Sequence, residues 1–277
     1  MRIGFLIFPG LTELDLIGPY EIVARLPGAE IHLMWKDAGP VRTEHGLALI
    51  PTTILNACPP LDLLCVPGGP GVNELLTDAE VLAFLRRVAP DACWVTSVCT
   101  GALVLGAAGL LHGRRATTHW MSRHFLVDFG AIPVDDRVVV DGNVVTGGGV
   151  TAGIDFALRI VAEVAGRETA EAIQPAVEYD PHPPFGAGTP RTAAAQIVAR
   201  AERQAAERQE YRAAQVARAV ALLRWCTALA GHTTRPGPRV PTPGRRARAP
   251  RAARPGAAGT TRSPTAGPDV PRGPAPA

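Results

Sequence analysis

Short apolar runs alternate with longer stretches of helical spacing over the first 180 residues of the chain. The apolar runs predict β-strands at Arg2–Phe8, Ala29–Trp35, Leu61–Val66 and Ala92–Val98. The stretches between and after them predict helices at Thr12–Leu26, Asp78–Val88, Thr100–Leu111, Thr151–Ala165 and Arg167–Val177. Strands that alternate with helices predict an α/β protein with a mostly parallel central sheet covered on both faces.

Three further segments interrupt or extend this alternation. Val41–Thr52 is expected to be a hairpin or a strand pair around His45-Gly46. Arg137–Thr146 is expected to be a hairpin with Asp141-Gly142 at its turn. Residues 190–230 are charged and alanine-rich, which predicts a C-terminal helical extension of one helix or two. We therefore expect one domain over residues 1–230.

The last 47 residues differ sharply in composition from the rest of the chain. Residues 231–277 hold nine arginines and one acid, a net charge of +8, whereas the whole chain carries +3 and residues 1–230 therefore carry −5. A segment made of Arg, Pro, Ala and Gly has too little apolar surface to offset its ordering entropy, so we expect a disordered tail. Its charge favours non-specific contact with nucleic acid at most, and an extension without function is the preferred interpretation.

Length and composition limit the remaining classes. A chain of 277 residues, 47% of them hydrophobic, can bury a full core. No apolar run is long enough to span a membrane, and the N-terminal run is too short for a secretory signal. The five cysteines are an odd number without the spacing of a disulfide framework, which favours reduced thiols and a cytoplasmic location. Cys58, Cys65 and Cys93 lie in apolar context and are interpreted as packing residues.

Cys99 is the strongest candidate for chemistry, because it lies between a predicted buried strand and a predicted helix. A nucleophile on a sharp strand-to-helix turn needs small neighbours, and Ser97 and Gly101 provide them. The start of a helix also offers free N–H groups, which predicts a thiolate at Cys99. The alternative is an ordinary buried cysteine.

Two other features are expected beside Cys99, since sites in open α/β sheets lie at the carboxyl ends of the strands. One is Asp15, after the first strand, which could otherwise be an ordinary acid in a first helical turn. The other is the turn Gly68-Gly69-Pro70-Gly71, where the amide of Gly69 or Gly71 could pair with that of Thr100 to bind a developing negative charge. No nucleotide-binding loop is present in the sequence.

The order of strand and acid, strand and GG-x-G, then strand and S-x-C-x-G resembles the superfamily of the PfpI protease, the parkinsonism-associated deglycase and the class I glutamine amidotransferases. Within it, five motifs are similar to the isonitrile hydratase family. They are Phe8-Pro9-Gly10, Leu14-Asp15-Leu16-Ile17-Gly18-Pro19, Ser97-Val98-Cys99-Thr100-Gly101, Ala116-Thr117-Thr118-His119-Trp120 and Glu178-Tyr179-Asp180-Pro181-His182-Pro183-Pro184-Phe185. The likeness covers about residues 1–225 and implies a flavodoxin-like three-layer sandwich with a cysteine nucleophile elbow.

That resemblance implies a function. It makes Cys99, Asp15 and Thr100 the catalytic residues, needs no metal or organic cofactor, and implies a homodimer. The expected reaction hydrates an isonitrile to an N-substituted formamide through a covalent thioimidate on Cys99, with one proton shared between Cys99 and Asp15.

Three alternatives remain. Proteolysis is disfavoured because Thr100 stands where PfpI-type proteases carry histidine, and a deglycase or glyoxalase is disfavoured because such members carry glutamate at the place of Asp15. The third is a sensor domain of AraC-type transcription regulators, which need a further DNA-binding region.

Two histidines are weaker candidates. His119 is expected to be a structural or pocket-wall residue near the substrate rather than a base. His182 lies in a proline-rich segment stiffened by fixed φ angles, and this segment either lines a pocket or fills a subunit interface. No cluster of His, Cys and acids has the spacing of a zinc site.

Overall fold

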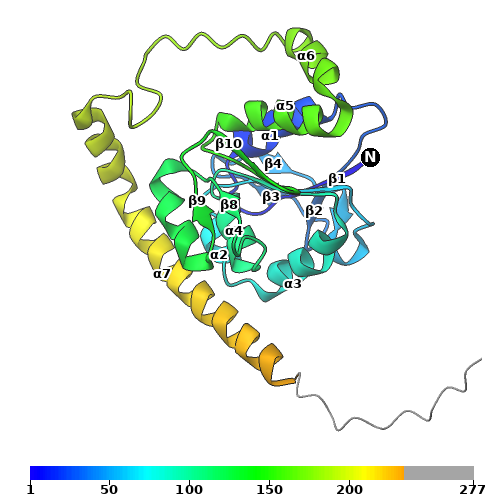
Figure 1. Ribbon diagram of the computed structural model, residues 1–277, viewed down its shortest axis with the longest axis vertical. Coiled ribbons are helices and arrows are strands. Elements are labelled where there is room, and N and C mark those ends of the chain that lie inside the picture. The colour runs from blue at the N-terminus through cyan, green and yellow to red at the C-terminus, as the bar shows by residue number, and fades with distance from the viewer. Residues whose placement is uncertain (234–277) are drawn as a thin grey trace, which may run out of the picture. The chain divides into compact units, whose positions relative to one another are not determined.

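A seven-stranded sheet runs through the protein, in a computed structural model that describes residues 1–233 (Figure 1). The strand order is β10-β11-β7-β6-β1-β2-β5, and all neighbours are parallel except β10 and β11. The strands are β1 (Arg2–Leu6), β2 (Glu30–Trp35), β5 (Thr53–Ile54), β6 (Leu63–Val66), β7 (Trp94–Val98), β10 (Val138–Asp141) and β11 (Val144–Gly147). The predicted mostly parallel sheet is confirmed.

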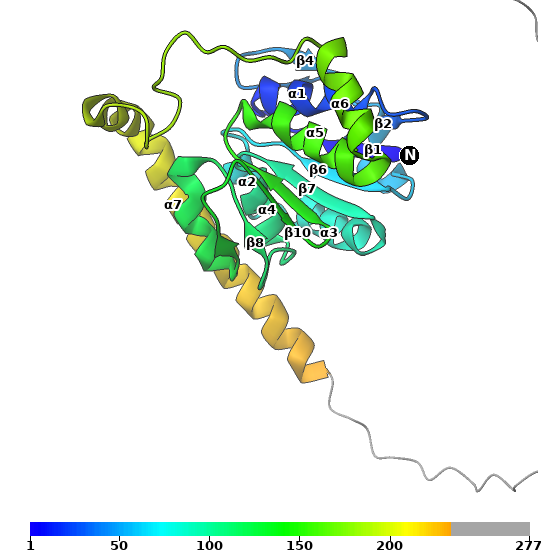
Figure 2. The ribbon, with the colours of Figure 1, turned by 45° about the horizontal axis from the view of Figure 1, so that its top comes forward.

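Helices cover both faces of this sheet (Figures 1 and 2). One face carries α1 (Glu13–Val23), α5 (Ala152–Ala165) and α6 (Arg167–Ala176). The other carries α2 (Val72–Leu75), α3 (Ala79–Val88), α4 (Gly101–Ala107) and the 3-10 helix η3 (Trp120–Phe129). Apolar side chains fill the space between these layers, among them the fully buried rings of Phe5, Phe8, Phe129 and Phe156. This arrangement is the three-layer sandwich expected from the sequence.

A long helix, α7 (Ala195–Thr233), forms the C-terminal part of the described chain (Figure 2). It packs against η3, α2 and α4 through a narrow stripe of buried side chains. The predicted helical extension is thus one unbroken helix. The expected disordered tail, beyond the end of α7, lies outside the described residues.

The short elements were only partly anticipated. The predicted hairpins are present, as β3 (Val41–Arg42) with β4 (Ala48–Leu49) and as β10 with β11. Six other elements of two to four residues were not predicted, because such lengths leave no periodic pattern. They are β5, β8 (Arg115–Ala116), β9 (Ile132–Pro133), α2, η1 (Leu55–Ala57) and η2 (Ala89–Asp91).

The register of the sheet determines which residues meet. Strands β1, β6 and β7 are adjacent and parallel, and β11 lies beside β7. Their carboxyl ends therefore bring four connections to one edge of the sheet. These connections carry Asp15, the turn Gly68–Gly71, Cys99 and the loop Gly148–Thr151.

Candidate active site

Cys99 occupies the predicted elbow between β7 and α4, with a left-handed backbone φ of 53°. Such a conformation is strained in a residue with a side chain and persists only when its surroundings hold it. The Cys99 N–H lies 3.0 Å from the carbonyl oxygens of both Gly147 and Gly148, and the Thr118 hydroxyl donates to the Cys99 carbonyl at 2.6 Å. The backbone is therefore held from both sides, and the position of the sulfur is fixed.

Close approach of two chain segments explains the glycine after the elbow. A Cβ atom on Gly101 would overlap the carbonyl oxygens of Val66 and Pro67, at the end of β6. The start of α4 can lie against β6 only because this side chain is absent. The glycine of the motif S-x-C-x-G is thus required by packing.

Asp15 lies in the first turn of α1 and is completely buried. Its Oδ2 accepts a hydrogen bond from the Gly68 N–H at 3.1 Å, whereas no N–H or O–H group of the described residues donates to Oδ1. Burial raises the pKa of Asp15 to about 7, against the hydrogen bonds from the Cys99 thiol and Gly68, which lower it. Near neutral pH this carboxyl can therefore both accept and donate a proton.

Burial also raises the pKa of the Cys99 thiol well above its ordinary value. The negative charge of Asp15 raises it further, while the backbone N–H groups of Thr100 and Val150 lower it. The expectation of a thiolate favoured by the helix start is therefore wrong for the free site, because desolvation and the neighbouring carboxylate outweigh two amides. The shared proton that was expected for Cys99 and Asp15 agrees with these shifts.

The glycine-rich turn lies beside Cys99, but its N–H groups donate hydrogen bonds to other groups of the protein. The N–H of Gly68 donates to Asp15, that of Gly69 to the Thr100 hydroxyl at 3.0 Å, and that of Gly71 to the Gly10 carbonyl at 3.0 Å. The interpretation of these glycines as oxyanion donors is therefore corrected. The N–H groups that act on the sulfur belong to Thr100 and Val150.

The Thr100 hydroxyl is also fully engaged. It accepts from the Gly69 N–H and donates to the Gly69 carbonyl at 3.3 Å. The side chain of Thr100 therefore joins the elbow to the glycine turn, and its backbone N–H is the group turned to the sulfur.

A cavity of about 280 Å³ opens onto Cys99. Residues from the elbow, the glycine turn, the first hairpin and α7 line it: Thr12, Glu44, His45, Gly69, Pro70, Cys99, Thr100, His119, Val150, Arg208, Gln209 and Arg212. The contribution of α7 was not foreseen. Its residues lie more than 100 positions after Cys99, and no local motif marks them.

Arg212 is the most buried of these additions, at 3% exposure. Its Nε donates to Asn73 Oδ1 at 2.9 Å and its guanidinium to Ser122 Oγ at 2.8 Å. Burial lowers the pKa of Arg212 to about 10, so the guanidinium stays charged at neutral pH. A fixed positive charge thus lies in the wall of the cavity.

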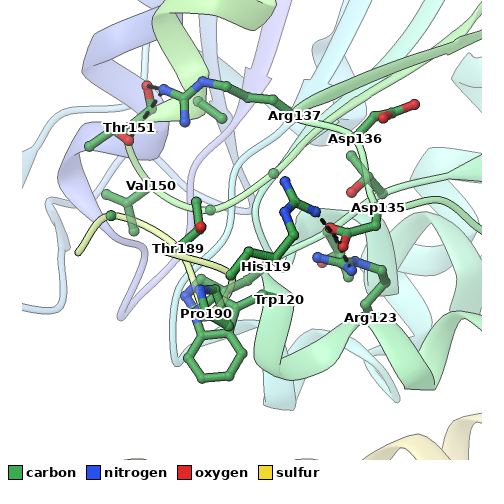
Figure 3. Close-up of a pocket in the computed structure, with 17 residues that line it drawn as sticks. His119, Trp120, Arg123, Asp135, Asp136, Arg137, Val150, Thr151, Thr189 and Pro190 are labelled. Atoms are coloured by element: carbon green, nitrogen blue, oxygen red, sulfur yellow. Dashed lines mark hydrogen bonds and ion pairs between the residues drawn. The ribbon is translucent and has the colours of Figure 1, made fainter. Parts of the chain in front are cut away.

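His119 lies between this cavity and a larger one of about 520 Å³ (Figure 3). Burial lowers the pKa of His119 to about 4, and Arg212, Arg208 and Arg123 lower it further, so the ring is neutral. Its Nδ1 accepts from the Met121 N–H at 3.3 Å, which assigns the proton to Nε2. As expected, His119 is a pocket-wall residue.

The larger cavity is lined by ionic side chains from η3, the β9–β10 connection and the segment before α7. Asp135 forms ion pairs with Arg123 at 2.7 Å and Arg191 at 2.6 Å (Figure 3). Gly188–Arg191 belong to the lining, whereas the His182 side chain is 83% exposed. The proline-rich segment thus reaches a pocket through its end and not through His182.

The other cysteines and the possible metal ligands complete the list of sequence candidates. Cys65 is buried and Cys58 is half-buried, but Cys93 is exposed, so its interpretation as a packing residue is wrong. No group of three or more His, Cys, Asp or Glu side chains comes together over residues 1–233 in a way that could hold a metal. Within that same range no helix combines the length and apolarity needed to cross a membrane.

The chain is similar to a family model, to a named enzyme and to a solved structure. Residues 1–163 match the model of the DJ-1/PfpI family. A Pseudomonas putida protein named isonitrile hydratase is 53% identical over 223 residues, which cover 80% of this chain and 98% of that protein. The crystal structure of a THiJ/PfpI family protein from Pseudomonas syringae superposes with a TM-score of 0.76 at 45% identity, covering 78% of this chain and 90% of that one.

A regulator shares part of the chain. The HTH-type transcriptional regulator GbdR of Pseudomonas aeruginosa is 30% identical over 186 residues, which cover 64% of this chain and 50% of the regulator. This similarity corresponds to the sensor-domain alternative considered from the sequence.

Proposed function

The chain belongs to the DJ-1/PfpI family, and from that premise we propose that it is an isonitrile hydratase, a hydro-lyase that converts isonitriles to N-substituted formamides. The observation that carries the proposal is the buried Cys99–Asp15 pair at the end of a cavity, in a chain 53% identical to a protein of that name. The match covers 98% of the length of that protein but only 50% of the length of the regulator GbdR. This difference in coverage favours an enzyme over a sensor domain.

The first step adds the thiol across the terminal carbon of the isonitrile. Asp15 accepts the Cys99 proton and delivers it to that carbon, which becomes electrophilic as it is protonated. Cys99 sulfur forms a bond to the same carbon, giving the thioimidate R–N=CH–S–Cys99 and a carboxylate at Asp15. A pKa near 7 suits Asp15 to both halves of this transfer.

The second step hydrates the thioimidate. Asp15 takes a proton from water while the water oxygen bonds to the thioimidate carbon. Asp15 then passes a proton to the nitrogen, which gives the adduct R–NH–CH(OH)–S–Cys99. The C–S bond then breaks, the hydroxyl proton returns through Asp15 to sulfur, and R–NH–CHO leaves. One water is consumed, and Cys99 and Asp15 return to their starting protonation.

The backbone amides near the sulfur assist both steps. The N–H groups of Thr100 and Val150 favour negative charge on sulfur, so they stabilise it while the proton is on Asp15 and when the C–S bond breaks. Thr100 thus contributes through its main chain and through the fixed position of Gly69.

The test supplies cyclohexyl isocyanide and measures the formamide, with methylglyoxal as a comparison substrate for the deglycase alternative. We expect formamide from the wild type, none above background from Cys99→Ala, and a loss of more than about 100-fold in kcat from Asp15→Asn, a typical effect of losing a general acid–base group. A Cys99→Ala variant as active as the wild type would exclude covalent catalysis. Turnover of methylglyoxal alone would instead support the deglycase.

The same proposal includes a homodimer and a cytoplasmic location. Leu14 and Ile17, on the same face of α1, are 38% and 42% exposed. A second copy of the chain would cover them. Sedimentation at micromolar concentration distinguishes the dimer from a monomer.

A further inference from the structure

Helix α7 brings two arginines, one turn apart, to the cavity of Cys99. Arg208 and Arg212 are separated by four residues, a spacing that places side chains on the same helix face, and both line the cavity. Arg212 is buried and Arg208 is exposed. The pair therefore extends from the wall of the cavity toward its mouth, as the course of α7 beside η3 allows (Figure 2).

Neither guanidinium forms an ion pair with a carboxylate among residues 1–233, although the charge of Glu44 acts on Arg212 from within the cavity lining. The hydrogen bonds of Arg212 go to the neutral groups of Asn73 and Ser122, which leave other N–H groups of its guanidinium without a bond in the described residues. Arg208 has neither an ion pair nor a side-chain hydrogen bond there. Burial of a charge without an opposite charge is costly, so this pair is suited to an anion that arrives from outside.

The other charged groups of the cavity do not cancel the two arginines. Glu44 is a carboxylate at the rim, bound by the Thr12 hydroxyl at 2.7 Å. His45 Nδ1 lies 3.0 Å from a carboxylate oxygen of Glu13, and this carboxylate raises the pKa of His45. Apart from the Cys99–Asp15 pair, which handles the proton, and His45, the cavity lining sets two arginines against one carboxylate.

We propose that the physiological isonitrile carries a carboxylate, which Arg208 and Arg212 bind while the isonitrile carbon faces Cys99. Guanidinium groups bind carboxylates through parallel N–H···O bonds with defined direction, so the pair would orient the substrate as well as attract it. An isonitrile is a one-carbon derivative of a primary amine, so an amino acid gives an isonitrile of this class. The product would then be an N-formyl amino acid. The proposal rests on the proposed function and adds the substrate class.

The experiment compares isocyano acids of two to four carbons with their methyl esters on the full-length protein. The acid of best length should exceed its ester in kcat/KM by at least about tenfold, the contribution of one charge-assisted hydrogen bond pair. Arg208→Gln should lower this preference severalfold, because Arg212 remains, and Arg208→Glu should abolish it. Arg208 is the variant of choice because it is exposed and its replacement does not threaten the fold.

A matched control lies on the same helix. Arg203 is exposed and lines neither cavity, so Arg203→Gln should leave the acid-to-ester ratio unchanged. Esters as good as acids in the wild type, or a preference for acids that persists in both Arg208 variants, would overturn the proposal.

A binding measurement separates this proposal from the reaction itself. Calorimetry with N-formylglycine and its methyl ester tests the anion site in Cys99→Ala, whatever the enzyme turns over. Preferential binding of the acid that disappears when Arg208→Glu is added supports the site even if cyclohexyl isocyanide gives no formamide. Equal binding of acid and ester overturns the carboxylate site, and formamide from cyclohexyl isocyanide then leaves the hydratase standing.

Discussion

Asp15 and Cys99 form a pair in which the fold opposes two negative charges. Both groups are buried, and burial raises both pKa values. The charge of Asp15 raises the pKa of the Cys99 thiol further, whereas the hydrogen bond from that thiol lowers the pKa of Asp15. The resting pair therefore holds a protonated thiol beside a carboxyl that titrates near neutrality. This is the reverse of the cysteine enzymes in which a neighbouring cation keeps the sulfur ionised.

A raised carboxyl pKa in the folded protein has a consequence for stability. The pKa of Asp15 rises from 3.8 to about 7, so the folded state keeps a proton that the unfolded state loses. The stability that this proton contributes is complete below pH 4 and is lost as pH rises through about 7. We expect Asp15→Asn to be more stable than the wild type at pH 8 by about 2 to 4 kcal/mol, because Asn does not ionise.

Chemical denaturation of both proteins between pH 4.5 and pH 8 measures this difference. The advantage of Asp15→Asn should grow with pH across that range, although the variant has lost turnover. Asp180→Asn, at an exposed site, provides the control and should follow the wild type. An advantage of Asp15→Asn that did not change with pH would contradict the raised pKa.

Among the elements, the contact between α4 and β6 positions the elbow. Gly101→Ala would force a methyl group onto the carbonyl oxygens of Val66 and Pro67. Backbone atoms cannot move aside as a flexible side chain can, so we expect a loss of about 2 to 3 kcal/mol in unfolding free energy, typical of overpacking in a core. Thermal unfolding measures it. Gly186→Ala, where a Cβ meets open space, should be neutral, and equal effects at the two sites would refute the explanation.

The longer elements could be predicted from sequence because their burial is periodic. Helix α3 follows its apolar stripe, and its start is marked by Asp78, whose Oδ1 accepts from the N–H groups of Glu80 and Val81. Helix η3 was missed, although it buries Ser122, Phe125, Leu126 and Phe129 at the i, i+3, i+4, i+7 spacing of an amphipathic helix. The ends of the strands also differ by one or two residues, as turn geometry decides them.

On the scale of the whole molecule, the position of the Asp15–Cys99 pair could be predicted from the topology. Asp15 and Cys99 each follow a strand, and parallel strands bring such positions to one edge. The N–H groups that act on the sulfur could not be predicted in this way. The hydrogen bonds that engage Gly69 and Gly71 depend on how α4 and the loop after β1 pack. Arg212 could not be found at all, since Asn73 and Ser122 lie 139 and 90 residues away in sequence.

We expect truncation of the C-terminal region to have different effects before and after residue 231. Deletion of residues 231–277 should leave turnover and Tm nearly unchanged, because that composition offers little apolar surface to bury. A chain ending at residue 211 should lose both stability and turnover, since Arg212, Gln215, Val216 and Ala219 of α7 are buried. Differential scanning calorimetry and the formamide assay compare the two truncations. Loss of turnover in the shorter deletion would show that the tail has a role.

The dependence of the cavity wall on α7 bears on how the protein is made. The ribosome completes β1, β6, β7 and the elbow long before it reaches Arg212, whose contacts close the wall. A domain that folds from its N-terminus during synthesis would therefore hold Cys99 beside an open wall until α7 emerges. Throughout that interval the nascent chain holds Cys99 without the helix that completes its cavity. Docking of α7 is then the last step in building the site.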